Sequence, residues 1–348
     1  MGRSGGRRVV RPGVLAATIA LSTAAGILPG PPSSATDPPT LPSVTSPGCS
    51  ATPAAPGERT VPLATGGRAG FYIEQLPSTY DGRTPLPVVL DFHGYEEPAA
   101  VQVSLSALGT LGEADDFITI TPGITTQPTP VWNVAPGSKD LSFVGHLLDA
   151  VEKTLCVDQR RVYVTGYSNG AFLTSSVACR FSDRVAAVAP VAGIRDVPGC
   201  RQVRPVPVVA FHGTADPLVH FDGSPSAQAA ALSPATPSGR TTASEAIGID
   251  LARPAPSIPK DAADWAARNG CAPGPVRSTP AHGVTLTRYR CPNGADVELY
   301  AVAGGGHTWP GSKDSAQLGT VLGTTTFAIS ADTLMWRFFR AHPLTARN

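Results

Sequence analysis

Continuous apolar runs alternate with amphipathic stretches along most of the chain. Strands are expected at 70–76, 86–92, 117–121, 161–165 and 297–302, and the continuous apolar runs at 185–191 and 206–211 are typical of strands that are covered on both faces. Helical spacing predicts helices at 100–113, 140–155, 171–180, 260–269 and 327–340. Strands that alternate with helices predict an α/β fold with a mainly parallel sheet and helices on both faces.

Local signals place some boundaries and leave two segments open. Pro122-Gly123 is expected to end the strand at 117–121, and Asp140 is a candidate N-cap of the next helix. The interval 192–205 is short and rich in turn residues, so either one turn of helix or an irregular connection joins its flanking strands. The Ser-, Ala-, Thr- and Pro-rich segment 222–259 is either a flap over a functional site or a mobile loop.

The beginning of the chain has the pattern of an export signal. Four arginines, at positions 3, 7, 8 and 11, precede a short apolar stretch at 14–21 and a run of small residues at 22–25. The apolar stretch is too short to span a bilayer. Residues 1–26 therefore predict a signal peptide, with Arg7-Arg8 leaving a twin-arginine signal open. Residues 27–57, rich in Pro, Ser, Thr and Ala, predict a linker, and regular structure is expected from about Arg59.

Composition narrows the class of partner. Of the 348 residues, 42% are hydrophobic and 15% charged, and the net charge is +1, so the chain can bury a sizeable core. Nucleic acids and anionic surfaces select a strongly basic face, which this balance argues against. We therefore expect no nucleic-acid and no membrane partner, and a monomer.

The cysteines point to an oxidising compartment. The chain has an even number of them, six, and all lie beyond the predicted signal peptide, at positions 49, 156, 179, 200, 271 and 291. None has the C-x-x-C spacing of a zinc or redox site, so we expect disulfides and no metal. Six cysteines allow 15 connectivities. Cys271 with Cys291, which flank an apparent hairpin, is the best single pair.

The segment Gly166-Tyr167-Ser168-Asn169-Gly170 follows a predicted strand and begins a predicted helix. In that context G-x-S-x-G forms a sharp turn that projects a serine hydroxyl above the carboxyl edge of the sheet. The flanking glycines relieve the crowding of the turn. Ser168 is therefore the candidate nucleophile, and the alternative is a helix N-cap serine.

A serine nucleophile needs a base and an acid, which follow it in this order: serine, acid, histidine. His307 comes after three glycines, just beyond the strand at 297–302, and is the candidate base. Asp216 comes after the strand at 206–211 and is the candidate acid, with Asp222 as the alternative. His212 is interpreted as a structural residue near the strand end.

Two backbone amides are expected to stabilise an oxyanion. One belongs to Asn169, immediately after the nucleophile, and the other to Tyr95, in the His93-Gly94-Tyr95 segment that follows the strand at 86–92. Such donors are each worth about a hundredfold or more in rate.

Six segments together resemble the secreted poly(3-hydroxybutyrate) depolymerase and feruloyl esterase-like family of α/β-hydrolases. They are LDFHGY (90–95), VWN (131–133), RVYVTGYSNGA (161–171), VAPVAG (188–193), FHGTADP (211–217) and GGHTWPG (305–311). The resemblance implies one α/β-hydrolase catalytic domain at 58–348 and the same triad, Ser168, Asp216 and His307. It also implies ester substrates drawn from hydroxyalkanoate fragments or from feruloyl and acetyl esters, and no cofactor.

Two tryptophans within the matching segments, Trp132 and Trp309, are candidate substrate-binding residues, because their rings could stack on an aromatic acid or a sugar; packing in the core is the alternative. The sequence thus predicts a secreted, extracellular serine ester hydrolase that acts through an acyl-enzyme. An acyltransferase on the same fold, or a catalytically silent binding protein, is the alternative.

Overall fold

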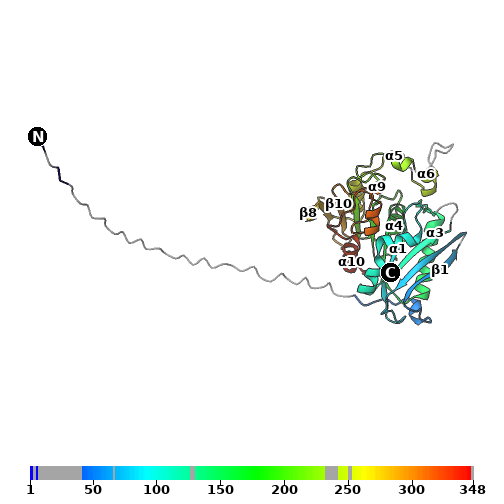
Figure 1. Ribbon diagram of the computed structural model, residues 1–348. Coiled ribbons are helices and arrows are strands. Elements are labelled where there is room, and N and C mark those ends of the chain that lie inside the picture. The colour runs from blue at the N-terminus through cyan, green and yellow to red at the C-terminus, as the bar shows by residue number, and fades with distance from the viewer. Residues whose placement is uncertain are drawn as a thin grey trace. The chain divides into compact units, whose positions relative to one another are not determined.

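One mixed sheet of ten strands organises the described part of the chain, in the order β1-β2-β4-β3-β5-β6-β7-β10-β9-β8. Its two edge strands, β1 and β8, lie on opposite sides of the domain in Figure 1. The computed structural model describes residues 1–2, 5–6, 41–65, 67–125, 130–231, 242–249 and 253–345. Most of the predicted signal peptide and the first part of the predicted linker, up to residue 40, lie outside these residues. The chain divides into two units, Met1–Thr40 and Leu41–Asn348, and the sheet belongs to the second.

The centre of the sheet is parallel and its two edges are antiparallel. Strands β4, β3, β5, β6, β7 and β10 run parallel, whereas β1 and β2 on one side and β9 and β8 on the other run antiparallel to their neighbours. The strands are β1 (Gly57–Thr65), β2 (Arg68–Leu76), β3 (Leu86–Phe92), β4 (Ile118–Ile124), β5 (Val157–Tyr167), β6 (Ala187–Val191), β7 (Val208–Gly213), β8 (Val276–Ala281), β9 (Val284–Tyr289) and β10 (Val297–Val302).

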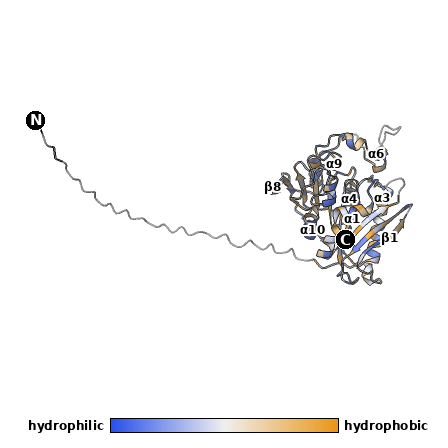
Figure 2. Ribbon diagram, viewed as in Figure 1, coloured by the Kyte–Doolittle hydropathy of each residue, from blue (hydrophilic) through white to orange (hydrophobic). Residues whose placement is uncertain are grey.

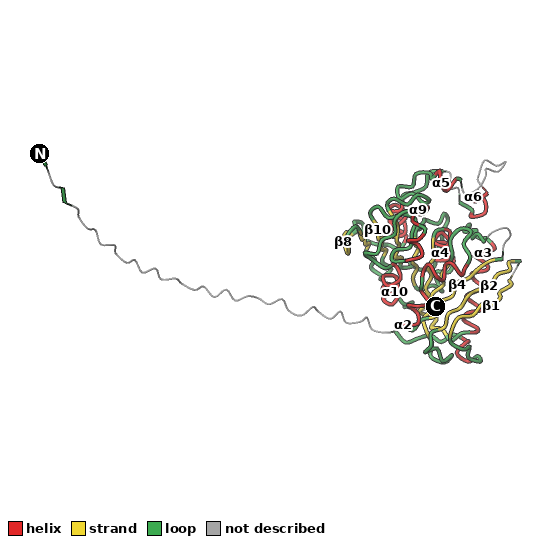
Figure 3. Tube along the Cα trace, in the orientation of Figure 1, coloured by secondary structure: helices red, strands yellow, loops and turns green. Residues whose placement is uncertain are grey.

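Helices cover both faces of this sheet (Figure 3). They are α1 (Ala99–Ser106), α2 (Leu108–Asp115), α3 (Lys139–Thr154), α4 (Asn169–Arg180), α5 (Ala227–Ala230), α6 (Thr242–Ile247), α7 (Ile258–Arg268), α8 (Lys313–Gln317), α9 (Gly319–Leu322) and α10 (Ala331–Ala341), together with the short 3₁₀ helix η1 (Pro47–Ser50). Among the described helices, none combines the length and apolar character that a bilayer crossing requires.

Alternation along β5 shows how the two cores arise. Val162 and Val164 point into the core formed with α3, α4 and α7, whereas Tyr163 and Tyr167 point into the core formed with α1, α2 and α10. Successive side chains of a strand face opposite sides of the sheet, so the part of a strand that is covered on both faces is mostly apolar. The hydropathy of these strands can be followed in Figure 2. The predicted fold class is confirmed: this is an α/β-hydrolase fold.

Several predicted boundaries were wrong for local reasons. The helix expected at 100–113 is two helices, because Ala107 adopts a left-handed backbone with φ 50° between them. Strand β4 continues through Pro122-Gly123 to Ile124 instead of ending there. A Cβ on Gly123 would lie 2.6 Å from the Phe71 ring, so this glycine serves close packing instead of a turn. The last helix begins at Ala331, four residues later than expected.

Asp140 is not the N-cap of α3. Ser138 takes that position, and its side chain accepts a hydrogen bond from the Leu141 N–H. Asp140 is buried instead, accepts a 2.7 Å hydrogen bond from Asn133 N and pairs with Arg68 at 2.5 Å. The connection at 192–205 is irregular, the second of the two predicted possibilities, and Cys179–Cys200 ties it to α4.

The part of the predicted linker that is described, from Leu41 onward, packs against the domain. Cys49 forms a disulfide with Cys156 at the start of β5. Ser46 is buried, and its hydroxyl donates to Leu155 O at 2.7 Å and accepts from Val157 N at 3.0 Å. A disulfide and buried polar contacts attach this segment to the domain. Because it is not held by large apolar residues, its sequence suggested a linker. The other disulfide, Cys271–Cys291, is the predicted pair.

Candidate active site

Ser168 lies at the sharp turn between β5 and α4, with φ 55° and ψ −115°. Its own N–H donates to Val191 O of the neighbouring strand at 2.9 Å, which holds the turn against the sheet. A Cβ on Gly166 would lie 2.6 Å from Gly170 O, and one on Gly170 would lie 2.1 Å from Phe92 O. Both glycines are therefore required by close approach of the backbone. The Ser168 hydroxyl has no hydrogen-bond partner among the described residues.

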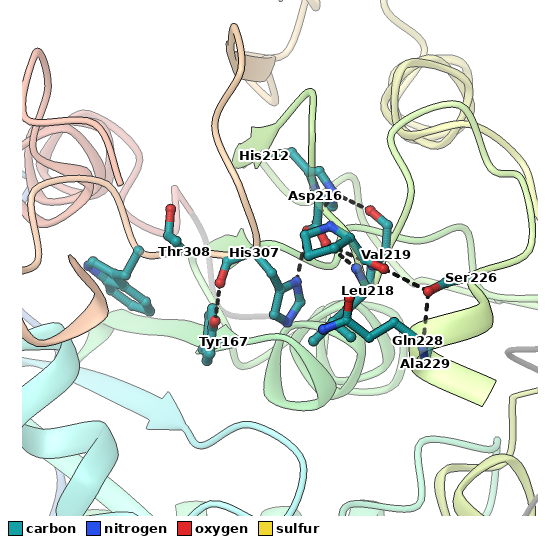
Figure 4. A network of polar contacts seen from close by, with 12 residues as sticks. Tyr167, His212, Asp216, Leu218, Val219, Ser226, Gln228, Ala229, His307 and Thr308 are labelled. Carbon is teal, nitrogen blue, oxygen red and sulfur yellow. Dashed lines mark hydrogen bonds and ion pairs between the residues drawn. The ribbon is translucent and has the colours of Figure 1, made fainter. Parts of the chain in front are cut away.

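His307 and Asp216 meet above two neighbouring parallel strands. Asp216 follows β7 and His307 follows β10, which pairs with β7 in register. Asp216 Oδ2 lies 2.7 Å from His307 Nδ1, and both side chains are buried (Figure 4). On the other side of His307, its carbonyl accepts a hydrogen bond from the Tyr167 hydroxyl. The ring is thus oriented through Nδ1, and Nε2 is left for another partner.

The Asp216 carboxylate is surrounded by donors. Its Oδ1 accepts hydrogen bonds from Leu218 N and Val219 N, each at 2.8 Å. Burial alone would raise its pKa, but the charges and hydrogen bonds of His307 and His212 outweigh burial and hold the pKa well below its usual value. Asp216 therefore remains ionised at neutral pH, as an acid that stabilises an imidazolium must.

His212 contacts Asp216, and this contact gives the residue that is interpreted as structural a specific place beside the candidate acid. Its Nε2 lies 3.2 Å from Asp216 Oδ2 and donates to Val219 O at 2.8 Å (Figure 4). It thus fixes the Asp216 loop from the side opposite His307. The alternative acid, Asp222, is exposed and hydrogen-bonds to Ser224 instead.

A cavity of about 410 Å³ opens at the turn and is lined by both Ser168 and His307. Most of the wall is apolar and comes from several loops and helices; it includes Val101, Leu105, Phe172, Leu218, Leu318 and Leu322. Ala229 of α5 and Ile247 of α6 also line it, so described parts of the segment 222–259 form one side of the cavity. Among the described residues, no group of His, Cys, Asp or Glu side chains could hold a metal ion.

Tyr95 and Asn169, the two residues whose amides are expected to bind an oxyanion, line this cavity with Ser168. Neither amide donates a hydrogen bond to another described residue. The Asn169 side chain is occupied elsewhere: Oδ1 accepts from Trp132 N at 2.8 Å, and Nδ2 donates to Trp132 O at 3.0 Å. This paired contact fixes the start of α4 against the loop at 130–134.

The structure does not bring Trp132 and Trp309 to the cavity. Both have 0% exposed surface, and neither lines it. The Trp132 indole donates to His93 O at 3.1 Å, and the Trp309 indole donates to Asp332 at 2.8 Å. Their predicted stacking on substrate is thus wrong; both rings pack beneath the loops that carry the site. Two indole N–H groups with buried partners are typical of packing residues.

Glu97 was not among the site residues predicted from the sequence. It lines the cavity, and its Oε2 accepts a 2.8 Å hydrogen bond from Gly94 N. Its Oε1 is buried without a hydrogen-bond partner among the described residues. Burial raises the pKa of Glu97 to about 7, although the Gly94 hydrogen bond opposes this. Three residues after His93-Gly94, Glu97 reads as an ordinary loop carboxylate, and only the fold shows that it is enclosed.

The backbone at Ser168 predicts a gain in stability on its replacement. A side-chain-bearing residue at φ 55° costs on the order of 1–3 kcal/mol, whereas glycine adopts this φ freely. We expect Ser168→Gly to raise the free energy of unfolding by about 1 kcal/mol in urea denaturation. Ser142→Gly, on the exposed face of α3, is the control and should lower it by roughly 0.5 kcal/mol. A loss of stability in Ser168→Gly would mean that the turn is not strained.

Comparisons with known proteins find relatives whose names are those of esterases and a depolymerase. No family model matches the chain. It is 27% identical to feruloyl esterase B of Piromyces equi over 244 residues, which is 68% of this chain and 42% of that protein. It is 30% identical to the bifunctional acetylxylan esterase/xylanase XynS20E of Neocallimastix patriciarum over 136 residues, or 39% of this chain and 20% of that protein.

A third relative is poly(3-hydroxyalkanoate) depolymerase C of Paucimonas lemoignei, 30% identical over 128 residues, or 34% of this chain and 30% of that protein. The chain thus spans less than half the length of these three relatives. In fold it is an α/β-hydrolase, and in sequence it is a homologue of proteins named feruloyl esterase, acetylxylan esterase and poly(3-hydroxyalkanoate) depolymerase.

Proposed function

We propose that the chain is a secreted carboxylic ester hydrolase in which Ser168 is the nucleophile, His307 the base and Asp216 the acid that orients it. The observation that carries the proposal is the buried 2.7 Å contact between Asp216 Oδ2 and His307 Nδ1, beside a cavity that Ser168 and His307 both line. The names of the homologues support the same reaction class. Three disulfides within the described residues support an oxidising, extracellular location.

In the acylation step, Ser168 Oγ attacks the ester carbonyl while His307 Nε2 takes its proton. The carbonyl oxygen becomes an oxyanion, which the N–H groups of Tyr95 and Asn169 stabilise. His307, now an imidazolium, is stabilised by the ionised Asp216 and gives its proton to the leaving alcohol. The bond between the carbonyl carbon and the alcohol oxygen breaks, and Ser168 carries the acyl group.

In the deacylation step, a water molecule takes the place of the alcohol. His307 Nε2 removes a proton from the water, whose oxygen attacks the acyl carbon, and the same two amides hold the second oxyanion. Collapse of this intermediate returns the proton to Ser168 Oγ and releases the carboxylic acid. The reaction needs no cofactor, nucleic acid or membrane, and a single chain supplies every group.

The lining of the cavity supports a substrate with an apolar portion. Apolar side chains, with leucine the most frequent, form most of its wall, and its volume of about 410 Å³ is in the range of small-molecule sites. We propose feruloyl esters, acetyl esters and short hydroxyalkanoate oligomers as the substrate class, since the names of the homologues span these three chemistries.

Replacement of Ser168 should abolish the activity. We expect the protein to react with a fluorophosphonate probe and to hydrolyse at least one ester among nitrophenyl esters, methyl ferulate, acetylated xylan and hydroxybutyrate oligomers. Ser168→Ala should lose both properties, with kcat reduced by roughly 10⁴-fold or more. Ser142→Ala, an exposed serine of α3, should retain both. Labelling and hydrolysis that survive Ser168→Ala would refute the assignment of the nucleophile.

We expect the ionisation of Glu97 to lower kcat/KM at alkaline pH. With a pKa of about 7, it is neutral at lower pH and becomes an unpaired anion as the pH rises. A Cβ on Gly94 would lie 2.6 Å from Glu97 Oε2 and 3.7 Å from Ser168 Cβ, so this charge forms next to the reacting serine. A neighbouring negative charge destabilises the oxyanion. We expect kcat/KM to fall by about tenfold between pH 7 and pH 9.

Glu97→Gln keeps an oxygen acceptor for Gly94 N and cannot ionise, so its kcat/KM should stay level over this range. The groups that face Glu97 are Tyr167 of β5, whose pKa is raised by burial and then by Glu97, and Asp91 of β3, whose own pKa burial raises to about 7. Glu58 is an exposed glutamate, and its variant Glu58→Gln should show the same fall in kcat/KM between pH 7 and pH 9 as the wild type. An unchanged fall in Glu97→Gln would assign it to another group.

A further inference from the structure

A second cavity, of about 240 Å³, adjoins the one at Ser168. Phe172, Leu218 and Val219 line both cavities, so they form the boundary between them. Phe172 is one helical turn after Ser168, and Leu218 and Val219 follow Asp216. Arg195 also lines the second cavity, together with other charged residues that include Asp196 and Asp261.

The backbone of Arg195 is fixed close to Ser168. Its N–H donates to Ser175 Oγ of α4 at 3.4 Å, and its carbonyl accepts from the Trp265 indole of α7 at 2.8 Å. Two residues earlier, a Cβ on Gly193 would lie 2.7 Å from Ser168 O. Because two residues span at most about 7 Å, the Arg195 Cα lies within about 11 Å of Ser168 O.

The Arg195 guanidinium is poorly satisfied within the protein. Nε donates to Asp196 O at 3.3 Å, and Nη1 is buried with no hydrogen-bond partner among the described residues. The described residues also give it no ion pair within 4.0 Å. A guanidinium has five N–H donors, and a buried cation without a partner is costly. Burial accordingly lowers the pKa of Arg195, although the Asp261 and Asp196 carboxylates oppose the shift.

The two nearby carboxylates favour the charge of Arg195 from a distance, and neither forms a hydrogen bond or ion pair with its guanidinium among the described residues. Asp196 pairs with Arg268. Asp261 lines the same cavity, but its Oδ1 accepts a 2.8 Å hydrogen bond from Asp196 N. Burial raises the pKa of Asp261 to about 7, so near neutral pH it is protonated for much of the time.

We propose that Arg195 binds a free carboxylate on the substrate, so that the preferred substrates are esters that carry a carboxylate a few atoms from the scissile bond. The ester lies at Ser168, and the carboxylate lies beyond Phe172, Leu218 and Val219 in the second cavity. Arginine suits this role because its planar fork matches two carboxylate oxygens. This inference rests on the proposed ester hydrolysis and defines its substrate class more closely.

Two matched substrate pairs test the proposal and distinguish which side of the ester bears the carboxylate. The first pair is the 4-nitrophenyl monoester of glutaric acid and its terminal amide, in which the variable group belongs to the acyl side. The second is the linear dimer of 3-hydroxybutyrate and its terminal amide, in which it belongs to the alcohol side. For each pair, the ratio of kcat/KM for the acid to that for the amide is measured.

We expect a ratio of about ten or more for one pair in the wild-type protein, from a charge-assisted hydrogen bond. Arg195→Gln should reduce this ratio to about one while it keeps kcat/KM for the amide within about twofold, which also reports that the variant is folded. Arg195→Lys, which keeps the charge and loses the fork, should give an intermediate ratio. Arg201→Gln, an exposed arginine of the same connection, should keep the wild-type ratio.

A ratio at or below one for both pairs in the wild type overturns the proposal, and it does so even if Arg195→Gln does not fold. A high ratio that persists in Arg195→Gln overturns it as well, because another group then binds the carboxylate. Equal hydrolysis of acid and amide leaves the ester hydrolase in place and removes only the carboxylate site. Failure of the wild type to hydrolyse any ester removes both.

Discussion

The backbone of Ser168 has a conformation that a residue with a side chain adopts only at a cost in free energy, and the surrounding strands impose it. Its N–H bonds to Val191 O, and Gly166 and Gly170 allow the turn to lie against Phe92 O, where a Cβ would not fit. Strain of this kind persists only where the neighbouring structure determines it. The direction of the serine hydroxyl, the start of α4 and the position of the Asn169 amide depend on this turn.

Around the turn, polar groups are fixed by buried partners before any substrate arrives. Asp216 accepts from two backbone N–H groups and lies between His307 and His212, so its charge is satisfied and its position is determined. Such preorganised polar groups cost little reorganisation during a reaction. Glu97 and Arg195 each keep a buried polar atom without a partner among the described residues, as His212 does at Nδ1. Glu97 at the first cavity and Arg195 at the second are incompletely hydrogen-bonded groups of opposite charge. They are features of these two cavities that the α/β-hydrolase fold alone does not require.

The sequence was sufficient where a local pattern decides the outcome, and insufficient where distant contacts do. The apolar runs predicted the parallel sheet, and chain order selected Ser168, Asp216 and His307, which the fold delivers to one edge. Burial separates Trp132 and Trp309 from the cavity, and no local signal predicts it. Glu97 and Arg195 resemble ordinary surface charges until neighbouring elements enclose them. Residues 41–57 look like a linker because a disulfide and a buried serine, instead of apolar side chains, attach them.

In the proposed reaction, ester hydrolysis passes through an acyl group on Ser168. The most direct measurement is rapid acid quenching of the protein with an excess of a nitrophenyl ester, followed by mass spectrometry of the intact chain and of its peptides. We expect a mass increase of one acyl group, on the peptide that contains Ser168, during steady-state turnover. Product formation with an acyl group on a different residue, or Ser168→Ala retaining the adduct, would contradict it.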